Sequence, residues 1–397
     1  MENQKEQKGA ALTRISELQR RRRLRKIRNI CIAVLVVLIA VLSFTGSWQK
    51  IYTAVSDVLD QARIAMMPGE GWPAKTGIPE ILQMEPLADG FAELGKQDLV
   101  MYSDNGNKIR SIQHGYARPA ISVGKDRLCL YSRSGNELRV ESRTRTLQVK
   151  EFEEPILLAQ MSSNGNLAVV TGAKRGLAEL TILDPAMKEI YGWTLVEENG
   201  LPSQIAFAND NRRLAVACLK AENGTFASSV YLLDTRKDKI SAEIKAAGSP
   251  ILQMRWLNDK KLLVVYKDRA VVYNANGEEL AKFEYGGKPL TDSVGFGSNT
   301  VMLFNQPQVD APARLVVLDA DLQCLTDIQV PSPVQGLACS RTHIYVLRKD
   351  SVVAYTMAGK LLWETELEAP PLAVLGSKPP LVFSGGEVDV LKKPEQK

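Results

Sequence analysis

The chain has 397 residues, of which 45% are apolar and 24% charged, and it carries a net charge of +5. Residues 1–28 hold ten Lys or Arg against three Asp or Glu, a net charge of +7, so residues 29–397 together carry −2. A nucleic-acid-binding domain needs a basic face on its folded part, and this distribution supports none. We therefore expect no nucleic-acid partner.

A basic cluster is followed directly by an apolar run. The apolar run has no charged side chain over the 21 residues from Asn29 to Gln49, which is long enough to cross a bilayer core of about 30 Å as a helix. Because the positive flank lies only before this run, we expect the N-terminus in the cytoplasm and the rest outside it. The topology signal consists of Arg20, Arg21, Arg22, Arg23, Arg25, Lys26 and Arg28.

The predicted domains are a basic cytoplasmic tail (1–28), a transmembrane helix (29–49), a juxtamembrane helix and linker (50–76) and an extracytoplasmic domain (77–397). This organisation places the protein in the plasma membrane as a single-pass protein, with lipid contacting the span and the basic flank. A cleaved signal peptide is the alternative, and Ser43–Ser47 is its weak cleavage site. The apolar stripe of Gln49–Met67 predicts a helix, which Pro68–Pro73 ends.

From about Gly77 onward, short β-strand patterns alternate with polar turns. One strand–turn–strand pattern recurs seven times, at intervals of about 40 residues. Its turns lie at Asp104, Ser142, Asp184, Asp234, Asn274, Asp319 and Thr356. A second pattern interleaves with the first and also has seven members, from ISVGKDRLCLYS at Ile121 to LAVLGSKPPLVFS at Leu372.

Two interleaved hairpins per repeat are typical of a β-propeller, which has four strands in each blade. The sequence therefore predicts an all-β fold, a seven-bladed propeller preceded by one transmembrane helix. Eight blades is the alternative, because EVDVL at Glu387–Leu391 adds an eighth copy of one strand type. We expect strands around Leu381–Leu391 to close the ring with strands near Phe91–Ile112. Two longer tips, Lys220–Ser229 and Asn305–Pro312, are candidate contact loops.

No catalytic, cofactor-binding or metal-binding residue emerges from the motifs. The chain has no P-loop, no G-x-S-x-G, no H-E-x-x-H and no C-x-x-C-H. Its only two histidines, His114 and His343, lie in different repeats, and the cysteines follow no disulfide or zinc spacing. The recurring Asp at the turns fits an Asx turn better than a calcium loop. We expect no cofactor, and the ligand-binding residues stay unassigned.

Parts of the chain resemble known propeller families. The phrase AGKLLWETEL at Ala358–Leu367 resembles the repeat of quinoprotein-like propellers, although most other repeats lack the Trp, and Ser162–Val170 resembles the WD40-like family. The layout of GEGWPAKTG at Gly69–Gly77 and of Gln113–Ser142 after one span resembles an uncharacterised family of membrane-anchored propeller proteins from Gram-positive bacteria. This last resemblance implies a fold and a location but no reaction.

The sequence thus favours a non-enzymatic protein-binding or scaffold module of the cell envelope, with an envelope protein as its partner. The alternatives are an extracytoplasmic ligand sensor and a quinoprotein-like enzyme. The enzyme is the weakest of the three, because the Trp of the repeat, a vicinal cysteine pair and a calcium site are missing.

Overall fold

The computed structural model describes residues 59–60, 62–64, 66, 69, 71–222, 224–237, 239–305 and 311–394. The predicted span, the basic cluster and most of the predicted juxtamembrane helix lie outside these residues. Within that helix, residues 59–60 and 62–64 are helical. No helix in the described part of the chain is long and apolar enough to cross a membrane.

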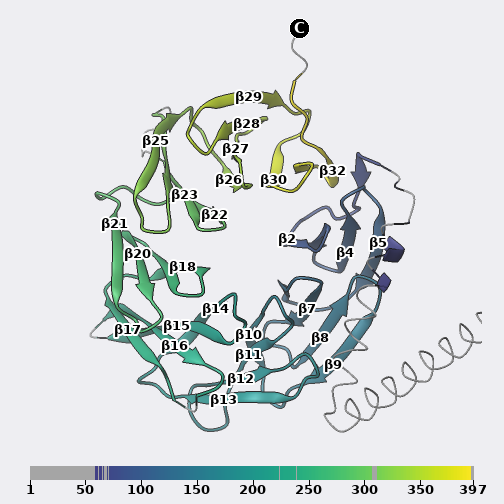
Figure 1. Cartoon of the computed structure of the whole chain (residues 1–397). Coiled ribbons are helices and arrows are strands. Elements are labelled where there is room, and N and C mark those ends of the chain that lie inside the picture. Colours follow the sequence, from purple (N-terminus) through teal and green to yellow (C-terminus); the bar gives the residue numbers. More distant parts are fainter. Residues whose placement is uncertain are drawn as a thin grey trace, which may run out of the picture. The chain divides into compact units, whose positions relative to one another are not determined.

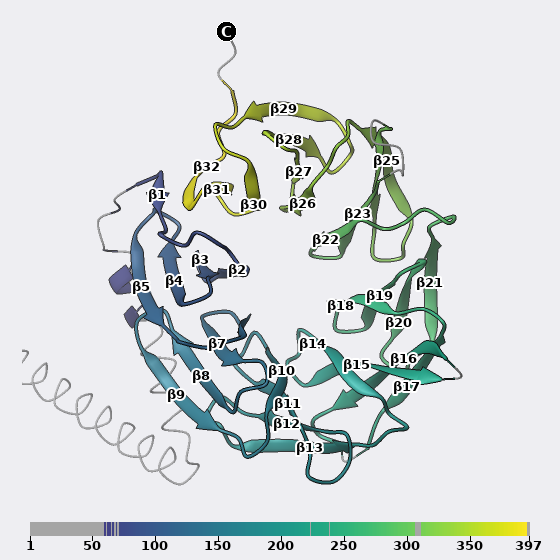
Figure 2. The same ribbon diagram turned by 180° about the vertical axis from the view of Figure 1, so that it is seen from behind.

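The described residues form a ring of eight antiparallel four-stranded sheets, which we number as blades 1 to 8 (Figures 1 and 2). In blades 1 to 7 the four strands are consecutive, and the first lies innermost. Blades 1 to 4 contain β2 (Gln83–Leu87), β3 (Gly90–Leu94), β4 (Asp98–Ser103), β5 (Lys108–Gln113); β6 (Pro119–Val123), β7 (Arg127–Ser132), β8 (Glu137–Ser142), β9 (Thr146–Glu151); β10 (Ile156–Met161), β11 (Leu167–Thr171), β12 (Ala178–Leu183), β13 (Glu189–Leu195); β14 (Leu201–Phe207), β15 (Arg213–Glu222), β16 (Thr225–Asp234) and β17 (Ala242–Ala247).

Blade 8 joins three C-terminal strands to one N-terminal strand, β1. Blades 5 to 8 contain β18 (Ile251–Asn258), β19 (Lys261–Tyr266), β20 (Arg269–Asn274), β21 (Glu279–Glu284); β22 (Asp292–Phe296), β23 (Asn299–Phe304), β24 (Ala313–Leu318), β25 (Cys324–Val330); β26 (Gly336–Cys339), β27 (His343–Leu347), β28 (Ser351–Thr356), β29 (Leu361–Glu366); β30 (Pro371–Leu375), β31 (Leu381–Ser384), β32 (Glu387–Val390) and β1 (Ala74–Lys75).

The prediction of seven blades is wrong, and the alternative of eight is confirmed. All seven predicted turns of the first pattern join the third and fourth strands of blades 1 to 7. The second pattern joins the first and second strands of blades 2 to 8. Each pattern has seven members, but the two series are offset by one blade, so together they describe eight.

The predicted ring closure is also wrong in its partner strand. The strands around Leu381–Leu391 pair with β1, where Ala74 lies opposite Val388 and Lys75 opposite Glu387, and Phe91–Ile112 belongs to blade 1 (Figure 2). The propeller therefore begins at Ala74, inside the predicted linker. The sequence missed this strand because two residues carry no periodicity.

Burial explains the strand patterns within a blade. The second strand of blade 5, β19, reads KLLVVY and is buried over its last five residues, whereas the outer strand β21 reads ELAKFE and alternates between exposed and half-buried positions. Middle strands face a neighbouring blade on both sides, so both of their faces need apolar residues. The outer strand has one face in water, which produces the period of two.

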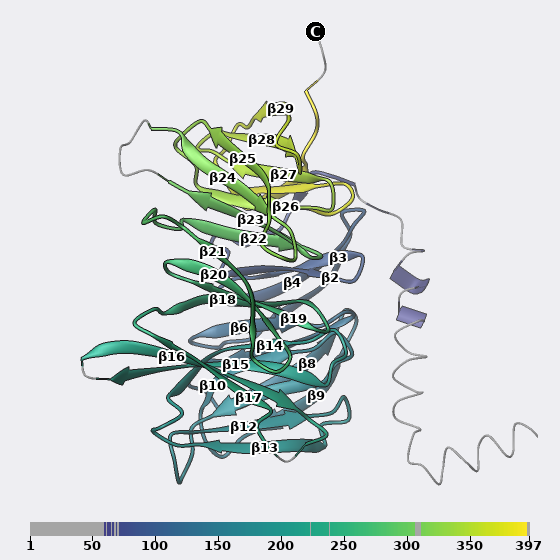
Figure 3. The same ribbon diagram turned by 60° about the vertical axis from the view of Figure 1, so that its left-hand side comes forward.

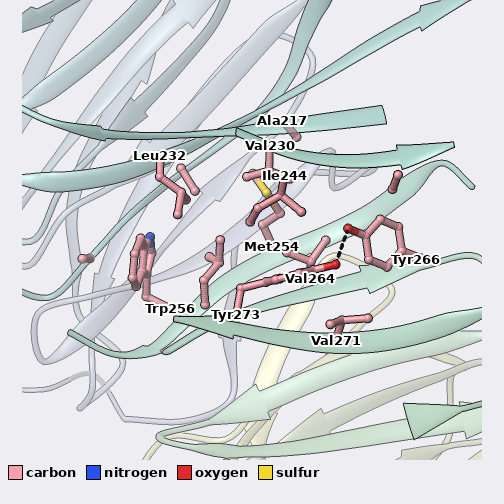
Figure 4. Close-up of a cluster of buried hydrophobic side chains, with 14 residues drawn as sticks. Ala217, Val230, Leu232, Ile244, Met254, Trp256, Val264, Tyr266, Val271 and Tyr273 are labelled. Atoms are coloured by element: carbon pink, nitrogen blue, oxygen red, sulfur yellow. Dashed lines mark hydrogen bonds between the residues drawn. The ribbon is translucent and has the colours of Figure 1, made fainter. Parts of the chain in front are cut away.

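The core is divided into eight clusters of buried side chains, and each cluster lies between two neighbouring blades. Figure 4 shows the cluster between blades 4 and 5, where Trp256 and Met254 meet Leu232 and Ile244. The ring is therefore held by packing between blades, and no single central core exists among the described residues.

Polar side chains on the inner strands add bonds from one blade to the next. Gln83 bridges blade 1 to blade 2, because its side chain accepts from the Ile121 amide at 2.8 Å. Gln204 Nε2 donates to the Leu252 carbonyl at 2.8 Å, and Asp292 Oδ2 accepts from the Leu337 amide at 2.8 Å. These bonds connect the inner strands of neighbouring blades.

Candidate functional site

The two faces of the disc differ in the loops that they carry. We call hairpin face the side with the turns between first and second and between third and fourth strands, such as 88–89 and 104–107 in blade 1. The connection face is the opposite side, with the turns between second and third strands and the links between blades, such as 95–97 and 114–118. A rigid scaffold with loops at its ends is the usual place for binding residues.

Asx turns shape the hairpin face, as the sequence predicts. Asp184 Oδ1 accepts from the amides of Ala186 at 2.9 Å and Lys188 at 3.0 Å. Asp319 Oδ1 accepts in the same way from the amides of Asp321 and Gln323, at 2.8 and 2.9 Å. These carboxylates are therefore occupied by their own turns, and the recurring Asp is a structural feature.

A pocket of about 900 Å³ opens on the connection face between blades 1 and 2. Its lining includes the link His114–Arg118, the cationic side chains of Lys96 and Arg133, and the amides of Gln97 and Gln113. Leu82 adds an apolar wall. No carboxylate contributes to this lining, so the pocket presents positive charge and hydrogen-bond donors.

His114 and Tyr116 form one wall of this pocket, and hydrogen bonds fix both side chains. Tyr116 donates its backbone N–H to His114 Nδ1 at 3.1 Å, and the other ring nitrogen, Nε2, lies 3.3 Å from the Gly95 carbonyl. Nδ1 is therefore the acceptor and Nε2 carries the proton. Burial lowers the pKa of His114, which keeps the imidazole neutral in its structural role.

The ion pair of Glu137 and Arg139 holds the Tyr116 side chain in place. Its hydroxyl donates to Glu137 Oε1, which also accepts from Arg139 Nε at 2.8 Å. The Arg139 guanidinium lies 5.7 Å from the centre of the Tyr116 ring, and the His114 ring stacks on it at 5.5 Å. The hydrogen bonds from Tyr116 and Arg139 hold the pKa of Glu137 below its ordinary value. The aromatic ring of Tyr116 thus has one fixed orientation.

Arg118 and Arg133 lie opposite each other at the mouth of the pocket. The Arg133 amide donates to the Arg118 carbonyl at 2.8 Å, which continues the pairing of β6 with β7 beyond Pro119 and Ser132. Both side chains are exposed. Neither guanidinium forms an ion pair with any described residue.

Sequence analysis did not single out these arginines, although a signal for them exists. The turn of ISVGKDRLCLYS fixes the register of its hairpin, with Val123 opposite Leu128. Counting outward from that turn places position 118 opposite position 133. The register of one hairpin would therefore have brought the two arginines together.

A second pocket, of about 480 Å³, lies on the hairpin face at the inner ends of blades 1, 6, 7 and 8. Phe296 and Leu375 line it together with Asp89 and Lys378. Phe296 is 43% exposed, a high value for a phenylalanine in a strand. The pocket combines apolar surface with two carboxylates, Asp89 and Asp104, and one cation, Lys378.

The predicted tip at Lys220–Ser229 is the end of a long hairpin rather than a loop. Strands β15 and β16 each run for ten residues and pair from Arg213–Asp234 out to Glu222–Thr225. The hairpin projects from the disc on the connection face (Figure 3). Phe226, near its end, is 61% exposed. The other predicted tip, at Asn305–Pro312, lies largely outside the described residues.

The described residues contain no group of three or more His, Cys, Asp or Glu that could hold a metal ion. The seven topology residues, Arg20 to Arg28, lie outside the described part of the chain. His114 lies in the link between blades 1 and 2 and His343 in β27 of blade 7, so the two are not brought together. Cys129 and Cys218 are buried, Cys339 is half-buried and Cys324 is exposed.

Comparison with known proteins adds a family and a fold. A model of a family of unknown function (DUF5711) matches residues 76–391, so the chain belongs to that family. No curated protein matches the chain.

Solved structures that resemble the chain are β-propellers. BamB from Moraxella catarrhalis is 13% identical, with a TM-score of 0.52 over 77% of this chain and 94% of its own. Hsv2 from Kluyveromyces lactis is 12% identical, with a TM-score of 0.51 over 72% of this chain and 99% of its own. KlAtg21, solved in complex with the coiled coil of AgAtg16, is 11% identical, with a TM-score of 0.51 over 73% of this chain and 100% of its own. At these identities the likeness concerns the fold alone.

Proposed function

We propose that this member of the DUF5711 family is a membrane-anchored, extracytoplasmic propeller that binds another protein of the cell envelope and catalyses no reaction. The span at 29–49 holds the disc at the plasma membrane, and the basic flank keeps the tail in the cytoplasm. The partner docks on the connection face.

One observation carries the proposal: the large pocket and the projecting β15–β16 hairpin lie on the same face of the ring. The hairpin exposes an aromatic side chain, Phe226, whose burial against a partner would remove apolar surface from water. The hairpin face has short turns in comparison, and its Asx carboxylates are satisfied. The complex of KlAtg21 with a coiled coil supplies a precedent for a protein docked on a propeller of similar fold.

Partner binding is tested by cross-linking from native membranes with the full-length anchored protein. Replacing Phe226 by Ser on the hairpin is expected to reduce the recovery of a specific envelope partner by about tenfold, as for loss of an aromatic anchor. The matched control is Phe296→Ser, which removes an exposed phenylalanine from the hairpin face. Equal recovery from the wild type and Phe226→Ser, or equal loss in both variants, contradicts docking on the connection face.

The location is tested with the exposed Cys324. A membrane-impermeant maleimide is expected to label Cys324 in intact cells as strongly as in lysed cells, because the disc lies outside the membrane barrier. Cys129 and Cys218 are buried and stay unlabelled in the folded protein. The Cys324→Ser variant is the control for residual labelling. Labelling of Cys324 only after lysis contradicts the extracytoplasmic location.

A further inference from the structure

We propose that the pocket between blades 1 and 2 binds an acidic segment of the protein partner, whose carboxylates pair with Arg118 and Arg133. This inference rests on the proposed function and names the chemistry of the partner.

The positive charges of Arg118 and Arg133 are not balanced by any carboxylate within the described fold. Their backbones are hydrogen-bonded at 2.8 Å, both side chains are exposed, and neither has a carboxylate partner among the described residues. Like charges on directly opposed residues of paired strands destabilise each other. A carboxylate placed between the two guanidinium groups removes this repulsion and accepts hydrogen bonds from both.

The surrounding groups keep the charge of the pocket positive. Lys96 is the third cation of the lining, and its Nζ lies 2.6 Å from Glu80 Oε2, so that charge is already partly balanced. Glu137 contacts the Tyr116 side chain, and it is engaged by hydrogen bonds from Tyr116 and Arg139. Arg118 and Arg133 are therefore the cations of this lining that have no carboxylate partner among the described residues. Arginine presents a planar fork of donors that matches a carboxylate in two parallel hydrogen bonds.

The size and the walls of the pocket favour a peptide segment over a small anion. Its volume of about 900 Å³ exceeds what a phosphate ion fills, and Leu82, Ala117 and Pro119 supply apolar surface beside the cations. The amides of Gln97 and Gln113 can pair with the polar backbone of an extended segment. Such a site suits alternating acidic and apolar side chains.

The structure also supplies a fixed geometry for the site. The rings of His114 and Tyr116 are stacked, and hydrogen bonds hold each of them. Arg118 lies in the same link, two residues after Tyr116, and the Arg133 amide is hydrogen-bonded to its carbonyl. The backbone at both arginines is therefore fixed before a ligand binds, so ordering the site costs side-chain entropy only.

The test measures binding of a fluorescein-labelled peptide with alternating Glu and Leu residues to the full-length protein in detergent. The Arg118→Glu/Arg133→Glu double variant is expected to bind the peptide more than about tenfold more weakly, because two charge-assisted contacts become repulsive. Arg118→Gln/Arg133→Gln removes the charge without repulsion and is expected to show an intermediate loss. Raising the salt concentration is expected to weaken binding by the wild type.

The matched control is Arg175→Glu/Lys267→Glu, which makes the same charge change at two exposed cations elsewhere on the connection face. This control is expected to bind the peptide like the wild type. An equal loss in both charge-reversed variants would show unspecific attraction and overturn the inference. Binding of inorganic phosphate as tightly as the peptide, with loss in the arginine variants, would also overturn it in favour of a small-anion site.

Failure of this inference and failure of the proposed function give different results. Cross-linking from membranes is repeated with the arginine variant. Suppose that Arg118→Glu/Arg133→Glu recovers the partner at the wild-type level, whereas Phe226→Ser does not. Docking on the connection face is then supported, and binding of an acidic segment by the two arginines is refuted. If no form recovers a partner, the proposed function fails. The inference of an acidic ligand then rests on the direct peptide measurement, where wild-type binding supports it and absence of binding refutes it.

Discussion

Blade 5 and blade 8 reach the same four-stranded sheet by different routes. In blade 5 the strands β18 to β21 follow one another within Ile251–Glu284, and none is shorter than six residues. Blade 8 contains strands of five, four and four residues, and its outer strand, β1, has two residues and comes from the other end of the domain. The backbone ladder that closes the ring is thus the shortest in the described structure.

Side chains of blade 1 compensate for this short ladder. The Phe91 ring packs on Tyr102 at 5.3 Å, on Phe383 of blade 8 at 5.0 Å and on Trp72 at 6.3 Å, which precedes β1. The Tyr102 hydroxyl donates to the Lys75 carbonyl at 3.1 Å. In blade 5 the buried Tyr266 and Tyr273 share one hydroxyl contact at 3.3 Å (Figure 4). Ring closure therefore depends more on aromatic packing around Phe91 than on strand pairing.

The largest expected effect follows from removing that residue. Phe91→Ala is expected to lower the free energy of unfolding by about 3–5 kcal/mol, the usual range for a buried phenylalanine. Because Phe91 supports both ends of the ring, the variant is also expected to become sensitive to protease near Trp72. Denaturant unfolding and limited proteolysis measure the two effects.

The control for this change is Phe304→Ala, which removes an equally buried phenylalanine in blade 6. It is expected to cost a similar free energy without new cleavage near Trp72. Cleavage at that site in both variants would show that closure has no special dependence on Phe91.

A buried carboxyl group near the closure predicts a dependence on pH. Glu93 is fully buried, and burial raises its pKa from 4.5 to about 7. A raised carboxyl pKa means that the fold binds the proton more tightly than the unfolded chain does. The free energy of unfolding therefore falls as pH rises from 4.5 to 7, by on the order of 3 kcal/mol for this group.

Glu93→Gln is expected to remove this loss, so that the variant gains stability relative to the wild type at pH 8 and not at pH 4.5. Denaturant unfolding at both values measures the difference. Glu366→Gln, at an exposed position of β29, is the control for a lost negative charge. A stability difference between Glu93→Gln and the wild type that is the same at both pH values contradicts the assignment.

The smallest expected effect concerns the inner strands away from the closure. Gln204→Ala removes the bond from blade 4 to the Leu252 carbonyl of blade 5, and it is expected to cost about 1 kcal/mol. Thermal unfolding of the variant measures this loss. Gln148→Ala, at an exposed position of the outer strand β9, is the control and is expected to cost less than Gln204→Ala. An equal effect of the two changes would show that the bonds between inner strands do not stabilise the ring.

The sequence predicted correctly those features of the fold that depend on residues close together in the chain. The turns at Asp184, Asp234 and Asp319 were assigned correctly because an Asx turn is made within a few residues of the chain. The first hairpin of blade 1 was missed because its turn, Ala88–Asp89, lacks the polar pattern of the other blades and has Ala88 at a φ of +50°. Without that hairpin, the number of predicted blades was seven rather than eight.

The candidate site was less accessible than the fold. His114 and Tyr116 are close in the chain, but Glu137 and Arg139 reach Tyr116 only through the packing of blade 2 against blade 1. Arg118 and Arg133 required the register of one hairpin, which the sequence contains. The pocket itself depends on how far apart two blades stand, and no pattern of residues gives that distance.

The position of β1 has a mechanical consequence. Tension on the chain before Ala74 acts directly on a strand that pairs with β32 at two positions only. Every other blade shares such a load among longer strands that are continuous in the chain. We expect the pairing of β1 with β32 to break at a lower force than any other strand pairing. The ring would then open at blade 8 before blades 1 to 7 unfold.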